Sequence, residues 1–122
     1  AALFGYVAQQ LGSLKLGYLH IIEGQTGGSR DADQRVDFAG LRQSFKQAGG
    51  RLTMVNNGYT KEMGESAVST GSVDLVAYGV PFLANPDLVS RFKNGHPLNA
   101  PDQATFYGGG EKGYTDYPVY AG

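Results

Sequence analysis

The chain has 122 residues, of which 41% are hydrophobic and 17% are charged, and its formal net charge is −1. These proportions are typical of one globular domain rather than a disordered segment. A charge so close to zero gives no reason to expect binding to nucleic acid or to a membrane surface. The sequence contains no cysteine, which excludes disulfides, thiolate zinc sites and Cys nucleophiles and fits a reducing compartment such as the cytoplasm.

The N-terminal residues indicate a chain cut from a longer one. The first residue is Ala1 rather than Met, and a helical pattern begins almost at once. The basic start and long apolar core of a signal peptide are missing, and no apolar run approaches the roughly 20 residues needed to cross a bilayer.

Helical and strand-like patterns alternate along the chain. Apolar residues at helical spacing predict amphipathic helices, and short apolar runs predict buried strands. Asn85 and Pro86 suit the N-cap and first turn of the last helix, in which we expect an inward-facing apolar side. That side would consist of Leu88, Val89 and Phe92. The predicted helices run over 2–12, from Phe38 to Gly49-Gly50, from Thr60 to Gly71 and from Asn85 to Gly95, and the predicted strands over 18–22, 52–55 and 73–77.

A helix followed by three strand–helix units is the pattern of a parallel sheet. The strands lack polar alternation, as strands covered on both faces should, and the amphipathic helices are expected on one side of the sheet. A complete (β/α)8 barrel takes about 250 residues, so this chain fits the last part of one. A small open flavodoxin-like sheet is the alternative, although it usually has more strands than the three predicted here.

Three segments of the second half occur in a distinctive order. They are Asp74-Leu-Val-Ala-Tyr-Gly-Val-Pro-Phe-Leu-Ala-Asn-Pro-Asp-Leu88, Ala104-Thr-Phe-Tyr107 and Gly113-Tyr-Thr-Asp-Tyr-Pro118. In this order they resemble the C-terminal end of the old yellow enzyme family of flavin-dependent ene-reductases, the NADH:flavin oxidoreductases. The resemblance runs through nearly the whole chain. It implies the C-terminal part of a TIM (β/α)8 barrel over residues 1–122, with 96–122 as a loop-rich tail.

Ligands of parallel α/β proteins meet the loops at the carboxyl ends of the strands. Here these loops are 23–33, 56–60 and 79–85. In barrels the last two often form a phosphate site, because Gly permits close approach of backbone N–H groups. On the residues alone, Asn56-Asn57-Gly58 is simply a turn and Gly79 a steric necessity.

The resemblance implies that these two loops hold the phosphate of FMN. Asn57, Gly58 and Tyr59 would contribute backbone amides, and so would Gly79 and Val80. Many family members carry Arg immediately after that Gly, where it makes a charge-assisted contact to the phosphate. Val80 offers only its backbone N–H, so some phosphate affinity would be lost or supplied from elsewhere.

The aromatic pair Phe106 and Tyr107 matches residues that lie after the last helix in this family. By resemblance, Phe106 would pack beside the flavin and Tyr107 would flank the substrate entrance. The alternative is that both aromatics merely seal the edge of the barrel. We expect the Tyr-Thr-Asp-Tyr-Pro tail to serve packing.

Other polar residues give little indication of chemistry. His20 lies in the middle of an apolar run and is interpreted as a core histidine, and His96 lies in a surface loop. Two isolated His without carboxylates at ligand spacing argue against a metal site. The sequence has no Gly-x-Ser-x-Gly elbow, and the segment from Gly108 to Gly113 does not match a phosphate-binding P-loop.

The family's reaction passes hydride from NADH or NADPH to FMN and then to the β-carbon of an activated alkene, such as an enone. Its substrate-holding pair and proton-donating Tyr come from earlier strands, so we expect no catalytic residue in this chain. The implied partners are the alkene substrate and the missing N-terminal barrel segment, or else a second copy of the chain. The rival hypothesis is an inactive structural half-barrel with at most a phosphate site.

Overall fold

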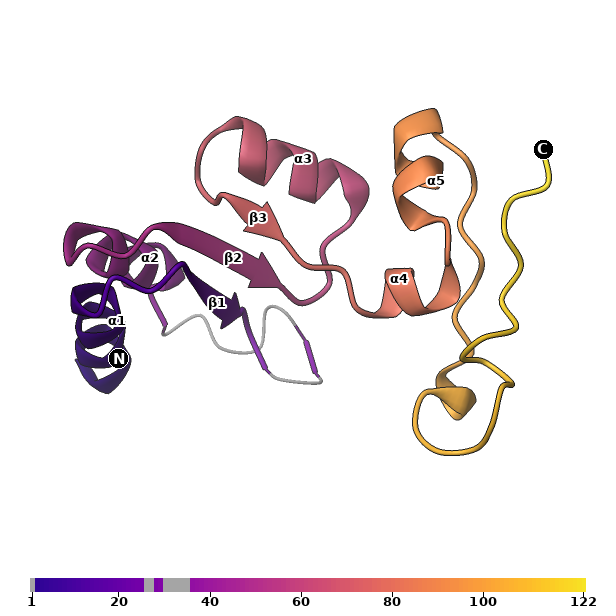
Figure 1. The fold of residues 1–122 in the computed structure, drawn as a ribbon, viewed down its shortest axis with the longest axis horizontal. Helices are drawn as coiled ribbons and strands as arrows, with labels where there is room; N and C mark the ends of the chain where they lie inside the picture. The colour runs from indigo at the N-terminus through magenta and orange to yellow at the C-terminus, as the bar shows by residue number, and fades with distance from the viewer. Residues whose placement is uncertain (1, 26–27, 30–35) are drawn as a thin grey trace. The chain divides into compact units, whose positions relative to one another are not determined.

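The structure, a computed structural model, describes residues 2–25, 28–29 and 36–122 (Figure 1). The chain forms two compact units, Ala1–Ala77 and Tyr78–Gly122. The first unit alternates helix and strand as the sequence predicts. Its elements are α1 (Ala2–Ser13), β1 (Tyr18–Ile22), α2 (Phe38–Gln47), β2 (Leu52–Asn56), α3 (Lys61–Ser69) and β3 (Leu75–Val76).

The three strands form a parallel sheet in the order β1-β2-β3, which confirms the predicted strand pairing. β3 has two residues rather than the five predicted. Its flanks nevertheless stay aligned with β2, because the N–H groups of Asp74 and Ala77 donate to the carbonyl oxygens of Thr53 and Val55. The apolar run 73–77 therefore follows the sheet, with the regular ladder confined to its centre.

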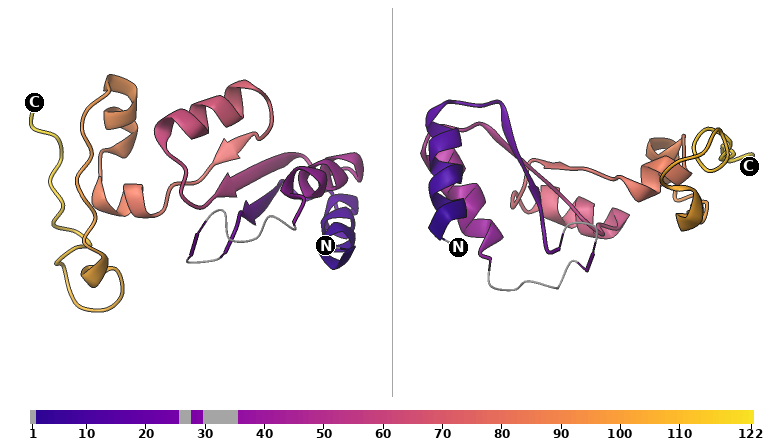
Figure 2. Two further views of the ribbon diagram at one scale, coloured as in Figure 1. Left: turned by 180° about the vertical axis from the view of Figure 1, so that it is seen from behind. Right: turned by 90° about the horizontal axis from the view of Figure 1, so that it is seen from below.

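The sheet has one covered and one uncovered face among the described residues. Ile21 and Val55 are buried on the side where α1, α2 and α3 lie (Figure 2). Register partners in a parallel pair project to the same face, and Tyr18, the partner of Leu52, is 55% exposed. The prediction of helices on one side agrees with this arrangement. The strands are not covered on both faces by the described residues.

The packing of α1 on α2 depends on two glycines around Phe45, which is fully buried. A Cβ on Gly12 would overlap the carbonyl oxygen of Phe45, and one on Gly50 would overlap its ring. The helices therefore approach closely only because Gly occupies position 12. This contact fixes the outer layer of the first unit.

The second unit contains α4 (Val80–Ala84), α5 (Leu88–Asn94) and the 3-10 turn η1 (Gln103–Thr105). The prediction of a loop over 79–85 was wrong, because α4 occupies most of it, with Pro81 in its first turn. The last helix also begins later than predicted, after Asp87. Asn85 does not cap it, since its amide donates to Pro81 O and its Oδ1 accepts from Asn99 N.

The inward face of α5 differs from the predicted one at two residues, Val89 and Arg91. Leu88 and Arg91 are buried, whereas Val89 is 70% exposed. Positions 88, 91 and 92 share one side of a helix by their i, i+3, i+4 spacing, which turns position 89 outward. The second buried residue on this side of α5 is thus Arg91, a polar residue that a search for apolar periodicity does not detect.

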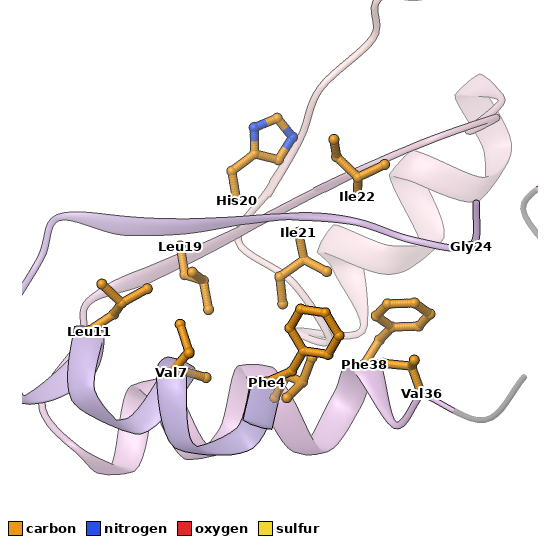
Figure 3. Close-up of a pocket in the computed structure, with 12 residues that line it drawn as sticks. Phe4, Val7, Leu11, Leu19, His20, Ile21, Ile22, Gly24, Val36 and Phe38 are labelled. Carbon is orange, nitrogen blue, oxygen red and sulfur yellow. The ribbon is translucent and has the colours of Figure 1, made fainter. Parts of the chain in front are cut away.

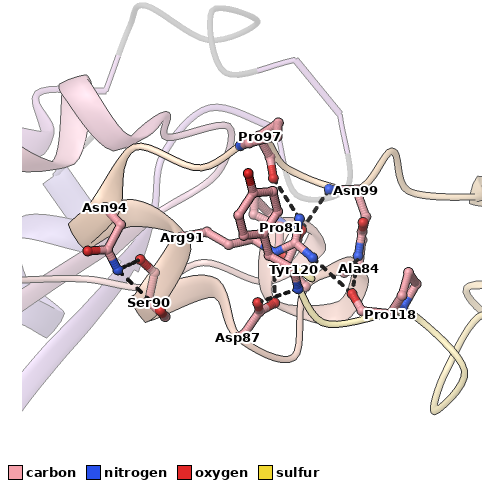
Figure 4. Close-up of polar contacts among 11 residues, drawn as sticks. Pro81, Ala84, Asp87, Ser90, Arg91, Asn94, Pro97, Asn99, Pro118 and Tyr120 are labelled. Carbon is pink, nitrogen blue, oxygen red and sulfur yellow. Dashed lines mark hydrogen bonds and ion pairs between the residues drawn. The ribbon is translucent and has the colours of Figure 1, made fainter. Parts of the chain in front are cut away.

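Arg91 holds the C-terminal tail against α5 (Figure 4). Its Nε donates to Asp87 Oδ1 at 2.7 Å, and its terminal nitrogens donate to the carbonyl oxygens of Pro97 and Pro118 at 2.6 and 2.9 Å. The N–H of Tyr120 donates to the other oxygen of Asp87. A buried guanidinium satisfied in this way links three separate segments of the second unit.

Candidate functional site

The turn after β2 has an unusual backbone at the carboxyl edge of the sheet. Asn57 and Gly58 have φ angles of 94° and 67°, so two successive residues are left-handed. Gly adopts this conformation freely, whereas a non-Gly residue does so at a cost that Asn bears better than most. The Nδ2 group of Asn57 donates to the carbonyl oxygens of Glu23 and Gln25, beyond the end of β1. The turn is therefore tied to the neighbouring strand.

A buried carboxylate lies beside this turn. Glu23 accepts hydrogen bonds from the hydroxyl of Tyr59 at 2.8 Å and from the guanidinium of Arg42 at 2.9 Å. Both Glu23 and Tyr59 are buried, so these contacts form in an environment of low dielectric where they are strong. Tyr59, one of the predicted cofactor-binding residues, thus has its side-chain hydroxyl engaged in a hydrogen bond within the protein.

The next residues of the chain begin α3 with a side-chain cap. Thr60 Oγ1 accepts from Met63 N at 3.3 Å. A hydrogen bond from its own backbone N–H and one from Thr60 lower the pKa of the exposed Glu62 carboxyl below its ordinary value. This arrangement is typical of a helix start that favours negative charge.

Gly79 and Val80 open the second unit, three and four residues after β3 ends. Gly79 has φ −84° and ψ −76°, which any residue can adopt, and no atom lies within 4 Å of the position of a Cβ. The prediction that Gly79 is a steric necessity is therefore wrong for this chain's own packing. Gly79 also lines a hollow of about 530 Å³ within the unit, together with Tyr78, Phe82, Leu83, Pro86, Tyr114, Thr115 and Tyr117.

The predicted aromatic pair follows η1. Phe106 is half-buried and Tyr107 is 94% exposed, and their rings meet edge to face at 6.4 Å. Tyr107 does not seal an edge within its own unit, which argues against the packing alternative for this residue. The tail after it is held by backbone contacts, and the hydroxyl of Tyr117 accepts from Asp102 N at 2.8 Å.

His20, interpreted from the sequence as a core histidine, has no covering element among the described residues. It is exposed on the face of the sheet that the described helices leave uncovered, and its Nε2 lies 3.1 Å from Asn56 Oδ1. His96 also differs from a plain loop residue, since its ring stacks on Tyr120 at 4.0 Å. The described part of the chain brings no three His, Asp or Glu together as a metal site.

An apolar cavity of about 420 Å³ lies in the first unit (Figure 3). α1, α2 and β1 surround it, with Phe4, Val7, Leu19, Ile21 and Phe38 pointing toward it. It contains no cluster of charged groups. The cavity is lined by residues of β1, the edge strand of the sheet.

Sequence reasoning missed the Glu23, Arg42 and Tyr59 contacts. One signal was available, because Arg42 lies on the inward face of its helix and an inward Arg requires a buried acceptor. The first predicted ligand loop also extends over residues 26–27 and 30–33, which lie outside the described residues. No described helix is long and apolar enough to span a bilayer.

The chain resembles flavin enzymes in both sequence and structure. The sequence profile of the NADH:flavin oxidoreductase / NADH oxidase family matches residues 4–99. The chain belongs to this family. The match covers the sheet, the Asn57-Gly58 turn and the start of the second unit.

Among relatives, a putative 12-oxophytodienoate reductase 12 of Oryza sativa subsp. japonica is 44% identical over 124 residues, which cover 96% of this chain and 30% of the relative. A probable flavin mononucleotide-dependent alkene reductase of Leishmania infantum is 37% identical, with 96% and 30% covered. The chain thus spans about 30% of the length of these relatives.

Solved structures give the same result. Morphinone reductase is 38% identical with a TM-score of 0.80, covering 98% of this chain and 31% of its own. The old yellow enzyme of Trypanosoma cruzi is 33% identical with a TM-score of 0.81, covering 98% and 30%. The fold is therefore a partial TIM barrel of the old yellow enzyme type, and the open flavodoxin-like alternative is excluded.

Proposed function

We propose that this chain supplies part of the FMN site of an NAD(P)H-dependent ene-reductase, within a complete barrel. The observation that carries the proposal is the pair of left-handed residues Asn57 and Gly58 at the carboxyl edge of a parallel sheet. Successive turns of this kind form concave backbone sites suited to anions, and barrel phosphates bind at this end. The residues therefore fit a flavin phosphate.

The proposed phosphate contacts come from two loops that follow neighbouring strands. Asn57, Gly58 and Tyr59 follow β2, and Gly79 and Val80 follow β3. The open space beside Gly79 leaves room for a ligand atom. With Val80 in place of the Arg of many family members, these contacts rely on backbone N–H groups without a neighbouring guanidinium.

Phe106 and Tyr107 are proposed to line the flavin and the substrate entrance. Tyr107 is almost fully exposed, so it can contact a bound molecule without breaking a packing contact. The hollow beside Gly79 has aromatic walls, which suits a planar apolar ligand. Phe106 is assigned to the cofactor and Tyr107 to the substrate.

Bound FMN would accept hydride from NADH or NADPH and deliver it to an activated alkene. In this arrangement the residues of this chain bind and orient the FMN. The groups that hold and protonate the substrate belong to the rest of the barrel. The proposed partners are therefore the alkene and the N-terminal segment of the barrel, or a second copy in its absence. A cytoplasmic location fits the cysteine-free sequence.

The test compares the chain alone with the chain co-expressed with the part of morphinone reductase that it does not cover. We expect the co-expressed pair to purify together, yellow with FMN, and to oxidise NADPH in the presence of an enone. The chain alone is expected to show no turnover with added FMN and NADPH. A colourless pair without bound FMN would refute the proposal and favour the structural half-barrel. Turnover by the chain alone would show that catalytic groups lie within it.

A further inference from the structure

We propose that Glu23 is a positioning residue that holds the Asn57-Gly58 turn in its left-handed conformation. The inference deepens the proposed function, on which its FMN measurement rests. Glu23 contacts the turn at three places. Its N–H donates to Asn56 O at 3.2 Å, its carbonyl oxygen accepts from Asn57 Nδ2, and its carboxylate accepts from the Tyr59 hydroxyl at 2.8 Å.

These three contacts bracket the strained residue. Asn56 precedes the left-handed pair and Tyr59 follows it, so both ends of the turn are attached to Glu23, the residue that follows β1. Asn57 itself is held through its side chain. A non-Gly residue keeps a positive φ only where its surroundings impose it, and Glu23 is common to all of these contacts.

Arg42 fixes the carboxylate itself. Its guanidinium donates to Glu23 Oε1 at 2.9 Å, which leaves Oε2 directed at Tyr59. The side chains of Arg42 and Glu23 are only 14% and 9% exposed, so water competes weakly for either oxygen. These contacts of Arg42 and Glu23, which we call the clamp, thus run from α2 through the end of β1 to the turn.

The experiment uses the 122-residue chain and measures hydrogen–deuterium exchange by mass spectrometry. Tyr59→Phe deletes only the hydroxyl, and Tyr6→Phe on α1, where the side chain is 61% exposed, is the matched control. In Tyr59→Phe we expect exchange of residues 56–60 to rise about tenfold, the size of one hydrogen bond to a charged acceptor. Exchange of α3 and of α5 should stay unchanged. Glu23→Gln should act in the same direction.

A second readout is the FMN dissociation constant from quenching of flavin fluorescence. Tyr59→Phe is expected to raise it about tenfold. Adding Asn57→Gly should restore affinity, because Gly takes a positive φ without help. Unchanged exchange at 56–60 in both Tyr59→Phe and Glu23→Gln would overturn the clamp, as would an equal rise across the whole first unit. The exchange result decides the clamp whether or not the unchanged chain binds FMN without the rest of the barrel.

Discussion

His20 and Asn56 meet across β1 and β2 on the open face of the sheet, with Nε2 and Oδ1 3.1 Å apart. Apolar neighbours share this face with them. Tyr18 is 55% exposed and Leu52 is 42% exposed, and Ile22 and Leu75 are exposed as well. In the related complete barrels such a face points inward, so the described residues leave a barrel interior without its partner.

We predict that the isolated chain self-associates through this face and the edges of its sheet, because exposed apolar strands with unpaired N–H and C=O groups favour pairing. Size-exclusion chromatography with light scattering measures the mass. Leu52→Glu should shift the chain toward monomer, whereas Val89→Glu on the exposed side of α5 should not. A folded, cooperative monomer of the unchanged chain would contradict the prediction and favour an independent module.

Substitutions of Gly58 and Gly79, the two glycines of the proposed phosphate site, should have different effects on stability. Gly79→Val should weaken FMN binding at an unchanged urea midpoint, since its φ of −84° suits any residue and its Cβ position is open. Gly58→Val should weaken binding and also destabilise the chain by about 1 kcal/mol or more, because its φ is 67°. Fluorescence titration with FMN and urea unfolding separate the effects. Unchanged FMN affinity in both variants would remove these loops from the site.

Asp74 should make the chain less stable in acid. The Lys46 ammonium holds the pKa of this carboxyl below its ordinary value, helped by the N–H and hydroxyl of Thr53, while burial opposes the shift. Because the pKa of Asp74 is lower in the folded chain than in the unfolded chain, its ionised carboxylate stabilises the fold at pH values above about 4, the pKa of an unfolded Asp. This stabilisation is lost as the pH falls through the pKa of the folded state.

Urea unfolding at one chain concentration should show this loss as the pH falls below about 4. Asp74→Asn should cost about 1 kcal/mol at pH 7, the net contribution of a typical hydrogen bond, and should flatten the acid limb. The control variant is Asp116→Asn in the tail, because the carboxylate of Asp116 forms no ion pair with the described residues of the second unit. An acid limb of equal slope in the Asp74 variant would rule out this role.

Arg91 should control the attachment of the tail. Arg91→Met leaves Asp87 and the carbonyl oxygens of Pro97 and Pro118 without their donor, and breaking a buried pair costs about 3–5 kcal/mol. We expect limited proteolysis to cleave within residues 97–122 much faster than in the unchanged chain. Lys93→Met, on the exposed side of the same helix, is the control. Equal cleavage rates in the two variants would show that Arg91 does not hold the tail.

Local patterns in the sequence determined the order of elements and the class of fold. The strands at 18–22 and 52–55, the cap at Thr60 and the parallel pairing all follow from apolar periodicity and short-range chemistry. The sequence did not predict the structure where a polar side chain hydrogen-bonds to a residue distant along the chain. Asn85 bonds to Asn99 rather than capping α5, so α4 and the later start of α5 were not foreseen.

The tertiary structure alone decided which polar groups are buried and which apolar groups are not. His20 and Leu19 are adjacent in one apolar run, yet the pleat sends them to opposite faces, of which only one is covered by described residues. Glu23, Arg42 and Tyr59 are far apart in sequence and meet because parallel pairing aligns the ends of β1 and β2. Periodicity reports which side of an element is apolar. Partners across the sheet are set by register and packing, which no local pattern contains.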